Sequence, residues 1–311
     1  MVTYQCRDAA RDCLRSVYEA TGDVELEVVV VDNASADGTA EMIRAEFPQA
    51  RLIALDRNLG FAAGVNLAAE SAEGEHVLLL NPDTIVHEGA IANLVAFARA
   101  NPQHGLYGGR TLWPDGRVCA GSCWGQPSLW SLFCFATMLS SAFKGSRLFD
   151  PESLGGWERD TVREVGIVTG CLLLAPRAVW RRLGGFDERF FMYGEDADLG
   201  MRAWAAGYRP AITPDSVITH EVGVSSESRP DKLVLLMRGK TTLLRKHWRS
   251  PRRELGIGLL LAGVGLRALA PRSLQGKNGG QPSAWREVWR ARRSWLEGYP
   301  QPEHARLRAV A

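Results

Sequence analysis

Carboxylates gather at a few points of the sequence, and two of them stand at or just after the end of a run of apolar residues. Asp32 ends the segment VVVVD and Asp83 ends LLLNPD. A third group, Glu195-Asp196-Ala197-Asp198, opens a stretch with helical periodicity, and His220 follows the apolar residues of VIT. Carboxylates and imidazoles can bind a nucleotide, hold a divalent cation or take a proton from a hydroxyl. These side chains are therefore the candidate functional groups.

Each of these groups also has a structural interpretation. An Asp after a strand commonly caps a turn, and Asn-Pro-Asp is itself a turn sequence. Three acids at a helix start interact favourably with the helix dipole. Like charges held close together also raise one pKa, which suits a general base. A lone His after an apolar strand is more often structural than a ligand.

Apolar strands and amphipathic helices alternate in the segments that must position these groups. Continuous apolar runs predict strands, and 3.6-residue periodicity predicts helices. We expect strands at 27–31, 51–55 and 76–80, and helices at 39–47, 61–72 and 88–100. This β-α-β order predicts a parallel sheet, whose ligands bind at the carboxyl ends of the strands. Asp32 and Asp83 should therefore mark the edge of the site.

The middle of the chain holds two further features. Residues 165–174 form a strand-like run interrupted by Gly170, and the acidic group opens a helix that reaches about residue 206. Residues 118–143 carry no formal charge, and residues 130–143 are rich in Trp, Phe, Leu and Met. That stretch is either a connection packed in the core or an apolar binding surface.

Four segments, in this order and spacing, resemble the inverting family 2 glycosyltransferases. They are VVVVDNASADGT, DRNLGFAAGVN, LLLNPDT and GGFDERFFMYGEDADLGMR, at residues 28–39, 56–66, 78–84 and 184–202. They look most like the bacterial rhamnosyltransferase-type branch of cell-surface polysaccharide assembly. The resemblance covers about residues 1–248. It implies an α/β, GT-A-like domain with two Rossmann-like halves, one central mixed sheet and helices on both faces. A helical C-terminal tail at 249–311 would follow it.

The resemblance also implies a nucleotide site and a metal site. Asn81-Pro82-Asp83 occupies the place of the family's Asp-x-Asp motif, and His220 resembles the His that completes the metal shell. Mg²⁺ or Mn²⁺ held by Asp83 and His220 would stabilise the leaving diphosphate. Asp37 is expected to be structural or to lie behind the ligand contacts. The residues implied in nucleotide binding are Thr3, Asp32, Arg57, Asn58, Gly60, Asn81 and Asp83, with Gly64 in the same loop region.

By the same resemblance Asp196 is the general base that deprotonates the acceptor hydroxyl, and Glu195 and Asp198 bind the acceptor. The expected reaction moves a hexose, taken to be L-rhamnose from dTDP-rhamnose, to a glycan or lipid-linked acceptor. Two alternatives remain open, a UDP-sugar donor and a non-catalytic glycan-assembly partner with the same fold. A Rossmann oxidoreductase would require G-x-G-x-x-G after its first strand, and DNASADG does not supply it.

Composition and charge bound the class of protein. The 311 residues are 46% apolar and 23% charged, which is ordinary for a globular chain and excludes a disordered one. Six cysteines stand without zinc or redox spacing, so we expect free thiols. Residues 1–244 hold 23 basic and 31 acidic side chains, whereas residues 245–311 hold 14 and 4. This basic end predicts an anionic partner.

The spaced tryptophans at the basic end favour a membrane surface over nucleic acid. Trp285, Val288, Trp289, Trp295 and Leu296 recur at near-helical spacing among arginines, as in a helix lying in the interface. The longest tail run without a charge, residues 255–266, is too short to span a bilayer, and the start lacks a signal-peptide pattern. We expect a cytoplasmic protein, peripheral at the inner membrane face.

The first predicted strand is short. Met1 and Val2 alone precede Thr3, whereas a strand of the expected sheet needs about five to six residues. Gln5 also stands where the family usually has Asn. We therefore expect the natural reading frame to extend upstream of Met1, with mostly Val, Ile and Leu in the added strand.

Overall fold

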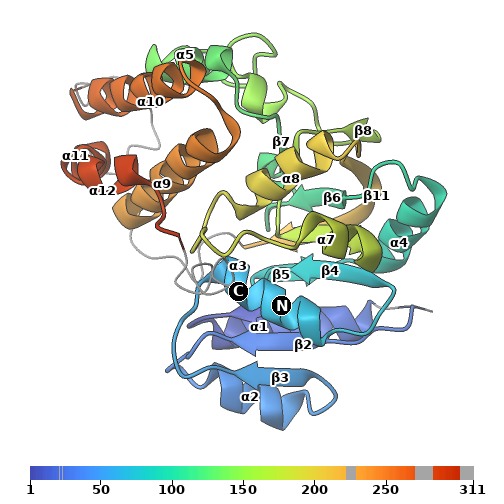
Figure 1. Ribbon diagram of the computed structural model, residues 1–311. Coiled ribbons are helices and arrows are strands. Elements are labelled where there is room, and N and C mark those ends of the chain that lie inside the picture. Colours follow the sequence, from blue (N-terminus) through green and yellow to red (C-terminus); the bar gives the residue numbers. More distant parts are fainter. Residues whose placement is uncertain (21, 23, 222–228, 270–282, 302–311) are drawn as a thin grey trace, which may run out of the picture. The chain divides into compact units, whose positions relative to one another are not determined.

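The computed structural model describes residues 1–20, 22, 24–221, 229–269 and 283–301, and these form two compact units (Figure 1). The first unit comprises residues 1–125, 157–187 and 196–225, and the second comprises residues 126–156, 188–195 and 226–311. Among the described residues, every strand belongs to the first unit, and the second unit is helical. The predicted α/β class is confirmed.

A parallel sheet begins the first unit. Its order is β1-β2-β3, with β1 at Val2–Thr3, β2 at Val29–Asp32 and β3 at Arg51–Ala54. The connections are α1 at Arg7–Glu19, α2 at Thr39–Glu46 and, after β3, α3 at Phe61–Ser71. All four residues of β2 are buried, which explains the unbroken apolar run in the sequence. The predicted β-α-β arrangement is confirmed.

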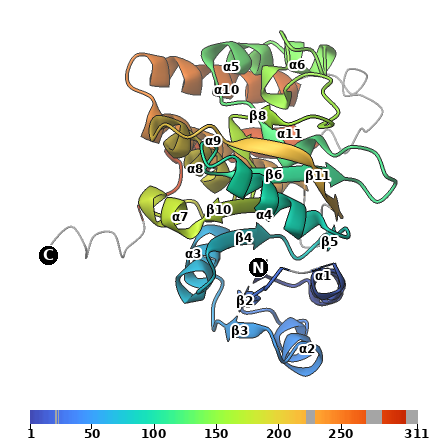
Figure 2. The ribbon, with the colours of Figure 1, turned by 90° about the vertical axis from the view of Figure 1, so that its right-hand side faces the viewer.

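A mixed sheet of six strands forms the rest of the unit's frame (Figure 2). Its order is β4-β10-β6-β11-β5, and β8 pairs with β11. Strand β4, expected to continue the parallel series, pairs antiparallel with β10 through all five of its residues. The expected single central sheet is therefore divided: the described strands form this six-stranded sheet, the parallel sheet in which β1 pairs only with β2, and a two-stranded pair at residues 123–124 and 167–168. The bounds are β4 His76–Leu80, β5 Thr84–Val86, β6 Tyr107–Leu112, β8 Arg163–Glu164, β10 Leu172–Pro176 and β11 Ala211–His220.

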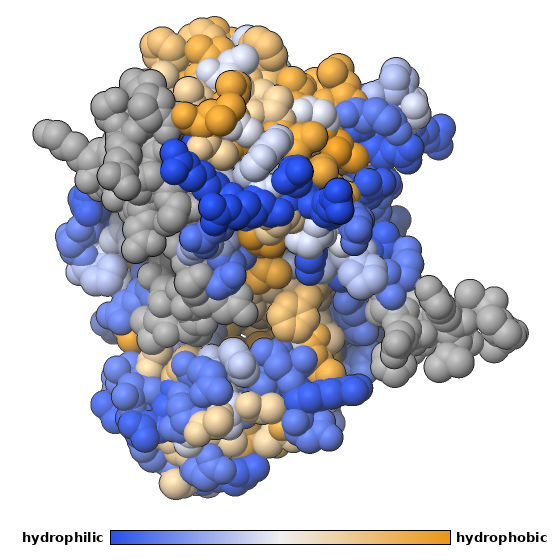
Figure 3. Space-filling model, turned by 90° about the vertical axis from the view of Figure 1, so that its left-hand side faces the viewer, coloured by the Kyte–Doolittle hydropathy of each residue, from blue (hydrophilic) through white to orange (hydrophobic). Residues whose placement is uncertain are grey.

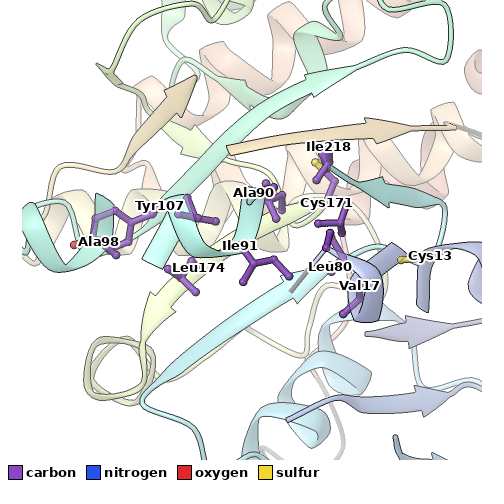
Figure 4. Packing of buried hydrophobic residues seen from close by; sticks show 14 residues of the cluster. Cys13, Val17, Leu80, Ala90, Ile91, Ala98, Tyr107, Cys171, Leu174 and Ile218 are labelled. Atoms are coloured by element: carbon purple, nitrogen blue, oxygen red, sulfur yellow. The ribbon is translucent and has the colours of Figure 1, made fainter. Parts of the chain in front are cut away.

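The core of this unit lies where α1 and α4, at Ala90–Ala100, contact the mixed sheet. Figure 4 shows Cys13 and Val17 of α1 and Ile91 of α4 directed toward strand residues such as Leu80 and Leu174. All six cysteines of the chain are buried and free, so the predicted free thiols are confirmed. The remaining elements are β7 Cys123–Trp124, β9 Ile167–Val168, α7 Arg177–Leu183 and α8 Glu195–Ala205.

The second unit packs its helices around a core of its own. Helix α5 packs on α10, and α11 contacts both α9 and α10. Leu132, Val264, Val288 and Trp295 are at most 1% exposed in this core. The bounds are α5 Leu129–Ala136, α6 Leu139–Ala142, α9 Arg229–His247, α10 Arg252–Leu269, α11 Ser283–Arg290 and α12 Arg292–Glu297. None of the described helices is long and apolar enough to cross a membrane.

The tail tryptophans lie differently from the sequence-based expectation. Trp295 and Val288 are fully buried, and Trp285, Trp289 and Leu296 pack against the same cluster. The apolar side of α11 and α12 therefore packs on the other helices of this unit, with Val288 and Trp295 fully covered, and membrane association of the tail stays a prediction. The helical periodicity was real, but it indicated an apolar face without indicating what covers it.

Candidate active site

The nucleotide-side residues predicted at the first strand ends lie together. Parallel pairing sets Thr3 opposite Asp32, and both side chains are buried. Thr3 Oγ1 donates to Asp32 Oδ1 at 2.8 Å, and Ser35 donates through its hydroxyl at 2.6 Å and its amide at 3.0 Å. Asp32 is thus fixed at the carboxyl edge of the sheet. Asp37 instead accepts from Arg7 N and Thr39, which is the structural role expected for it.

The next predicted loop is tied to the same strand end. Asn33 donates to Gly60 O at 3.2 Å and accepts from Leu59 N at 3.2 Å, while Asn58 Oδ1 accepts from Gly60 N at 2.8 Å. Gly60 has φ 87°, a conformation that favours glycine, and Arg57 is exposed. Loop 57–60 therefore borders the end of β2.

Gly64, from the same motif, has a packing role. A Cβ at this position would lie 3.0 Å from Val2 and 3.5 Å from the Asn33 amide. The glycine therefore lets α3 approach the parallel sheet, a contact that requires no ligand.

Asp83 and His220 meet across two strands. Antiparallel pairing of β11 with β5 sets His220 opposite Thr84, and Glu221 N donates to Asp83 O at 2.9 Å. The Nε2 of His220 lies 3.0 Å from Oδ1 of Asp83, and Asp83 is 9% exposed. Asn81 begins the same turn, where its carbonyl accepts from the Thr84 hydroxyl at 2.7 Å.

The environment of His220 favours its protonated form. Burial alone would lower the pKa of His220, but the hydrogen bond to Asp83, with a further contribution from Cys171, raises it to about 9. Cys171 also lies 3.0 Å from the Thr169 hydroxyl. The imidazole is therefore held between the carboxylate of the turn before β5 and the thiol of the turn before β10.

Asp196 is linked to the Asp83–His220 pair through two adjacent residues, Gly170 and Cys171. Its partly buried carboxylate accepts from Ala197 N at 2.7 Å and from the backbone amide of Gly170. Gly170 is followed directly by Cys171, which bonds to His220. Burial raises the pKa of Asp196 to about 6. Adjacent residues thus contact the predicted base and the predicted metal ligand.

The two flanking acids of this motif are more buried than Asp196. Asp198 is fully buried and accepts from Arg202 Nε at 2.7 Å. Arg202 also donates to the carbonyls of Leu183 and Gly185, so the pair connects α8 to the Gly-Gly turn. Glu195 is 5% exposed. Asp198 thus has a positioning contact, and its contact with the acceptor stays a prediction.

Two positioning residues escaped the sequence analysis. Asn66 donates to Phe186 O at 2.9 Å and accepts from Phe186 N at 2.9 Å, which joins the second motif to the fourth. Cys13 contacts both Asn81 O, at 3.4 Å, and the Thr84 hydroxyl, at 3.5 Å. Their types carry no functional signal, although Asn66 falls inside a motif.

The donor set of Asp83 and His220 fits a divalent cation that displaces the His220 proton on binding. Mg²⁺ in proteins is commonly held by one or two carboxylates together with substrate phosphates. In the part of the chain that the structure describes, no three His, Cys, Asp or Glu side chains are grouped as ligands. The two protein ligands therefore leave coordination positions for diphosphate oxygens and water.

Similar solved structures show which class of protein has this fold. A mannosyltransferase from Pyrobaculum calidifontis, in complex with GDP-mannose and Mn²⁺, matches with a TM-score of 0.57 and 20% identity, over 95% of this chain and 85% of that one. GalNAc-T7 with UDP, GalNAc and Mn²⁺ matches with a TM-score of 0.56 and 14% identity, over 97% and 57%. The fold is that of the GT-A glycosyltransferases.

Sequence comparison gives the family. Glycosyl transferase family 2 matches residues 1–130, and glycosyl transferase family group 2 matches residues 157–309. The N-acetylglucosaminyl-diphospho-decaprenol L-rhamnosyltransferase of Mycobacterium tuberculosis is 31% identical over 248 residues, which is 74% of this chain and 77% of that protein. The O-antigen biosynthesis protein RfbC of Myxococcus xanthus is 30% identical over 70% of this chain and 16% of its own length. The chain belongs to glycosyltransferase family 2.

Proposed function

We propose that this enzyme transfers L-rhamnose from dTDP-rhamnose to a lipid-linked or glycan acceptor, with inversion at the anomeric carbon. The observation that carries the proposal is the link between Asp196 and the Asp83–His220 pair: the Gly170 amide donates to Asp196, and the side chain of the next residue, Cys171, is hydrogen-bonded to His220. The Mycobacterium tuberculosis relative, named as a rhamnosyltransferase with a decaprenol-linked acceptor, supports the choice of sugar and acceptor.

In this proposal the ends of the parallel strands hold the donor. Asp32, fixed by Thr3 and Ser35, faces the base or ribose, and loop 57–60 with Arg57 borders the nucleotide. Asn81 and Asp83 lie where the diphosphate would bind. A divalent cation held by Asp83 and His220 would neutralise the charge of the leaving diphosphate.

Asp196 then acts as the general base. Its carboxylate is fixed by the amides of Ala197 and Gly170, which leaves lone pairs for an acceptor hydroxyl. As the acceptor oxygen attacks the anomeric carbon, its proton passes to Asp196 and the bond to the diphosphate breaks. A pKa of about 6 keeps the base ionised at neutral pH while making it a better proton acceptor than an ordinary Asp.

We also propose that the reaction takes place at the cytoplasmic face of the membrane, where a lipid-linked acceptor is anchored. The excess of basic residues after residue 244 supports an anionic surface as partner.

A donor panel tests the function. The purified protein is incubated with a water-soluble lipid-diphosphate sugar acceptor and with dTDP-rhamnose, UDP-N-acetylglucosamine, UDP-galactose or GDP-mannose, each with Mn²⁺, Mg²⁺ or chelator. We expect release of dTDP from dTDP-rhamnose that requires both the metal and the acceptor. Preference for a UDP-sugar would show that the donor is a UDP-sugar and not dTDP-rhamnose. A folded protein that turns over none of the donors would instead be a non-catalytic partner.

A further inference from the structure

The second unit carries an exposed apolar stripe along α10. Leu255, Leu266 and Leu269 are 55%, 47% and 81% exposed. Gly258 and Ala262, also exposed, lie between them at steps of three and four residues, so all five share one helix face. The opposite face, with Leu260 and Val264, is buried against the core. This stripe, Leu255-Gly258-Ala262-Leu266-Leu269, is called the α10 stripe.

A cluster of exposed aromatic side chains lies on α5 and the segment after α6. Trp130 and Phe133 are 43% and 41% exposed and stack with ring centroids 5.5 Å apart. Phe143, 52% exposed, contacts Phe149 at 5.0 Å. Trp130 Nε1 donates to Leu148 O at 2.6 Å, so the cluster is fixed in place. Helix α5 packs on α10, so the aromatic cluster and the α10 stripe belong to two neighbouring helices, called the α5–α10 layer.

Basic side chains border this layer. Helix α11 packs on α10, where the Trp289 ring closely approaches Gly265, and it exposes Arg286 and Arg290. Lys144 and Arg147 stand between the exposed Phe143 and Leu148. In residues 249–269 and 283–301, Arg outnumbers acidic residues eight to three. Figure 3 shows hydrophobic residues gathered at the upper end of this unit, beside a band of hydrophilic side chains.

We propose that the α10 stripe and the aromatic cluster dock the enzyme on an anionic lipid bilayer. The inference rests on the proposed function in one respect, that the acceptor is lipid-linked. Apolar side chains flanked by cations match a bilayer surface, where leucines enter the acyl boundary and arginines meet phosphates. The 18 residues of α10 make a helix about 27 Å long, which would lie along the bilayer surface. The fully buried Trp295 takes no part in this contact.

Vesicle co-sedimentation tests the docking surface. The full chain is mixed with phosphatidylcholine vesicles with or without phosphatidylglycerol, at low and high salt. The stripe variant carries Leu255→Gln, Leu266→Gln and Leu269→Gln, and a second variant carries Arg286→Gln and Arg290→Gln. Val162→Gln, at a 53% exposed site in the first unit, is the matched control.

We expect the stripe variant to bind anionic vesicles at least tenfold more weakly, with Val162→Gln unchanged. The arginine variant should lose most of the salt-sensitive part of binding. All variants should keep wild-type turnover of the water-soluble acceptor. If the proposed function is wrong, this turnover is missing in the wild type and in every variant, whereas a wrong docking surface changes only the result of the vesicle experiment. Wild-type vesicle binding by the stripe variant would overturn the proposal. A wild-type dimer that the leucine changes dissociate, without vesicle binding, would identify the surface as a contact between copies.

Discussion

The Asp83–His220 pair depends on one strand pairing. His220 faces Thr84 in the β11–β5 register, so a side chain 137 positions later in the sequence reaches the carboxylate of the Asn-Pro-Asp turn at 3.0 Å. Cys171 approaches the same imidazole from the turn directly before β10. The site is thus assembled from strand ends whose order the sheet determines.

The metal assignment predicts a common defect at both positions. In Asp83→Asn and His220→Ala, Mn²⁺ should no longer increase the affinity for the nucleoside diphosphate, because one protein ligand is lost in each. We expect at least a tenfold loss of metal-dependent nucleotide affinity by calorimetry. His87→Ala is the control, since His87 is an exposed side chain that bonds to Thr219 one residue before His220. Unchanged metal and nucleotide affinity in both variants would refute the assignment.

Asp196→Asn should separate binding from chemistry. The amide keeps the shape and the acceptor oxygen but cannot take a proton, so kcat should fall by about 10² or more while donor affinity is retained. In the wild type, kcat should decline as pH falls through about 6, because protonation removes the base. Turnover of the Asn variant near the wild-type rate would exclude this role for Asp196.

The same raised pKa has a stability consequence with a definite sign. The native protein holds a proton on Asp196 up to about pH 6, whereas an unfolded Asp releases it near 3.8. The ionised carboxylate therefore lowers the free energy of unfolding, and this loss develops between about pH 3.8 and pH 6 and is complete above it. Asp196→Asn should unfold at a higher temperature than the wild type at pH 8, and the difference should vanish at pH 3. A difference that is independent of pH would mean that burial of the charge is not its cause.

The sequence indicated a functional role for a single residue where that residue type is unusual at its position in a strand or helix. A carboxylate at the end of an apolar run suggests chemistry from the sequence, and Asp32 and Asp83 were singled out that way, whereas His220 was singled out through the family resemblance. Cys171 and Asn66 were not, because their roles arise from neighbours that only the fold brings near. The pairing of Asp198 with Arg202 was readable as an i,i+4 spacing but was outweighed by the acidic cluster.

At the scale of elements, helix α9 and the end of the described chain hold the segment 190–194. Gly239 of α9 lies so close to Tyr193 that a Cβ there would be 2.1 Å from its carbonyl oxygen. Tyr299 donates its hydroxyl to Met192 O at 2.5 Å and contacts Phe190 edge to face. This segment leads along the chain directly into Glu195 and Asp196.

Gly239→Ala should therefore impair catalysis by displacing segment 190–194. The added methyl group has no room, so either α9 or the segment must shift, and we expect kcat to fall by at least tenfold while the protein still folds. Gly258→Ala on α10 is the matched control, because nothing lies within 4 Å of its Cβ position and Ala favours a helix. Equal kcat in Gly239→Ala and wild type would show that the segment does not position the base.

Elements were predicted more securely than their partners. The strand and helix ranges before residue 100 follow from apolar runs and periodicity, and most bounds agree within two residues. The antiparallel pairing of β4 with β10 could not be predicted, because Leu-rich strands match many partners. For the same reason, the spacing of Trp285, Trp289 and Trp295 correctly indicated helices but not the surface that covers them.

On the scale of the whole molecule, the C-terminal segment is part of a folded unit. Trp295→Ala removes a fully buried ring whose Nε1 donates to Val288 O at 2.9 Å, and should cost about 3–5 kcal/mol of unfolding free energy. Trp130→Ala, at a 43% exposed site in the same unit, is the matched control and should cost much less. Denaturant unfolding measures both, and equal losses would contradict the burial of Trp295.

The second unit is built from three separate stretches of chain, and this has a consequence during synthesis. More than a hundred residues separate the end of α5 from the start of α10, which covers its buried face. At about 5–20 residues per second, α5 leaves the ribosome several seconds before that partner has been translated. Until then, Leu132 and Phe135 remain uncovered beside the exposed Trp130 and Phe133. The nascent chain therefore passes through a stage in which both faces of this helix expose apolar side chains, the kind of surface that chaperones bind.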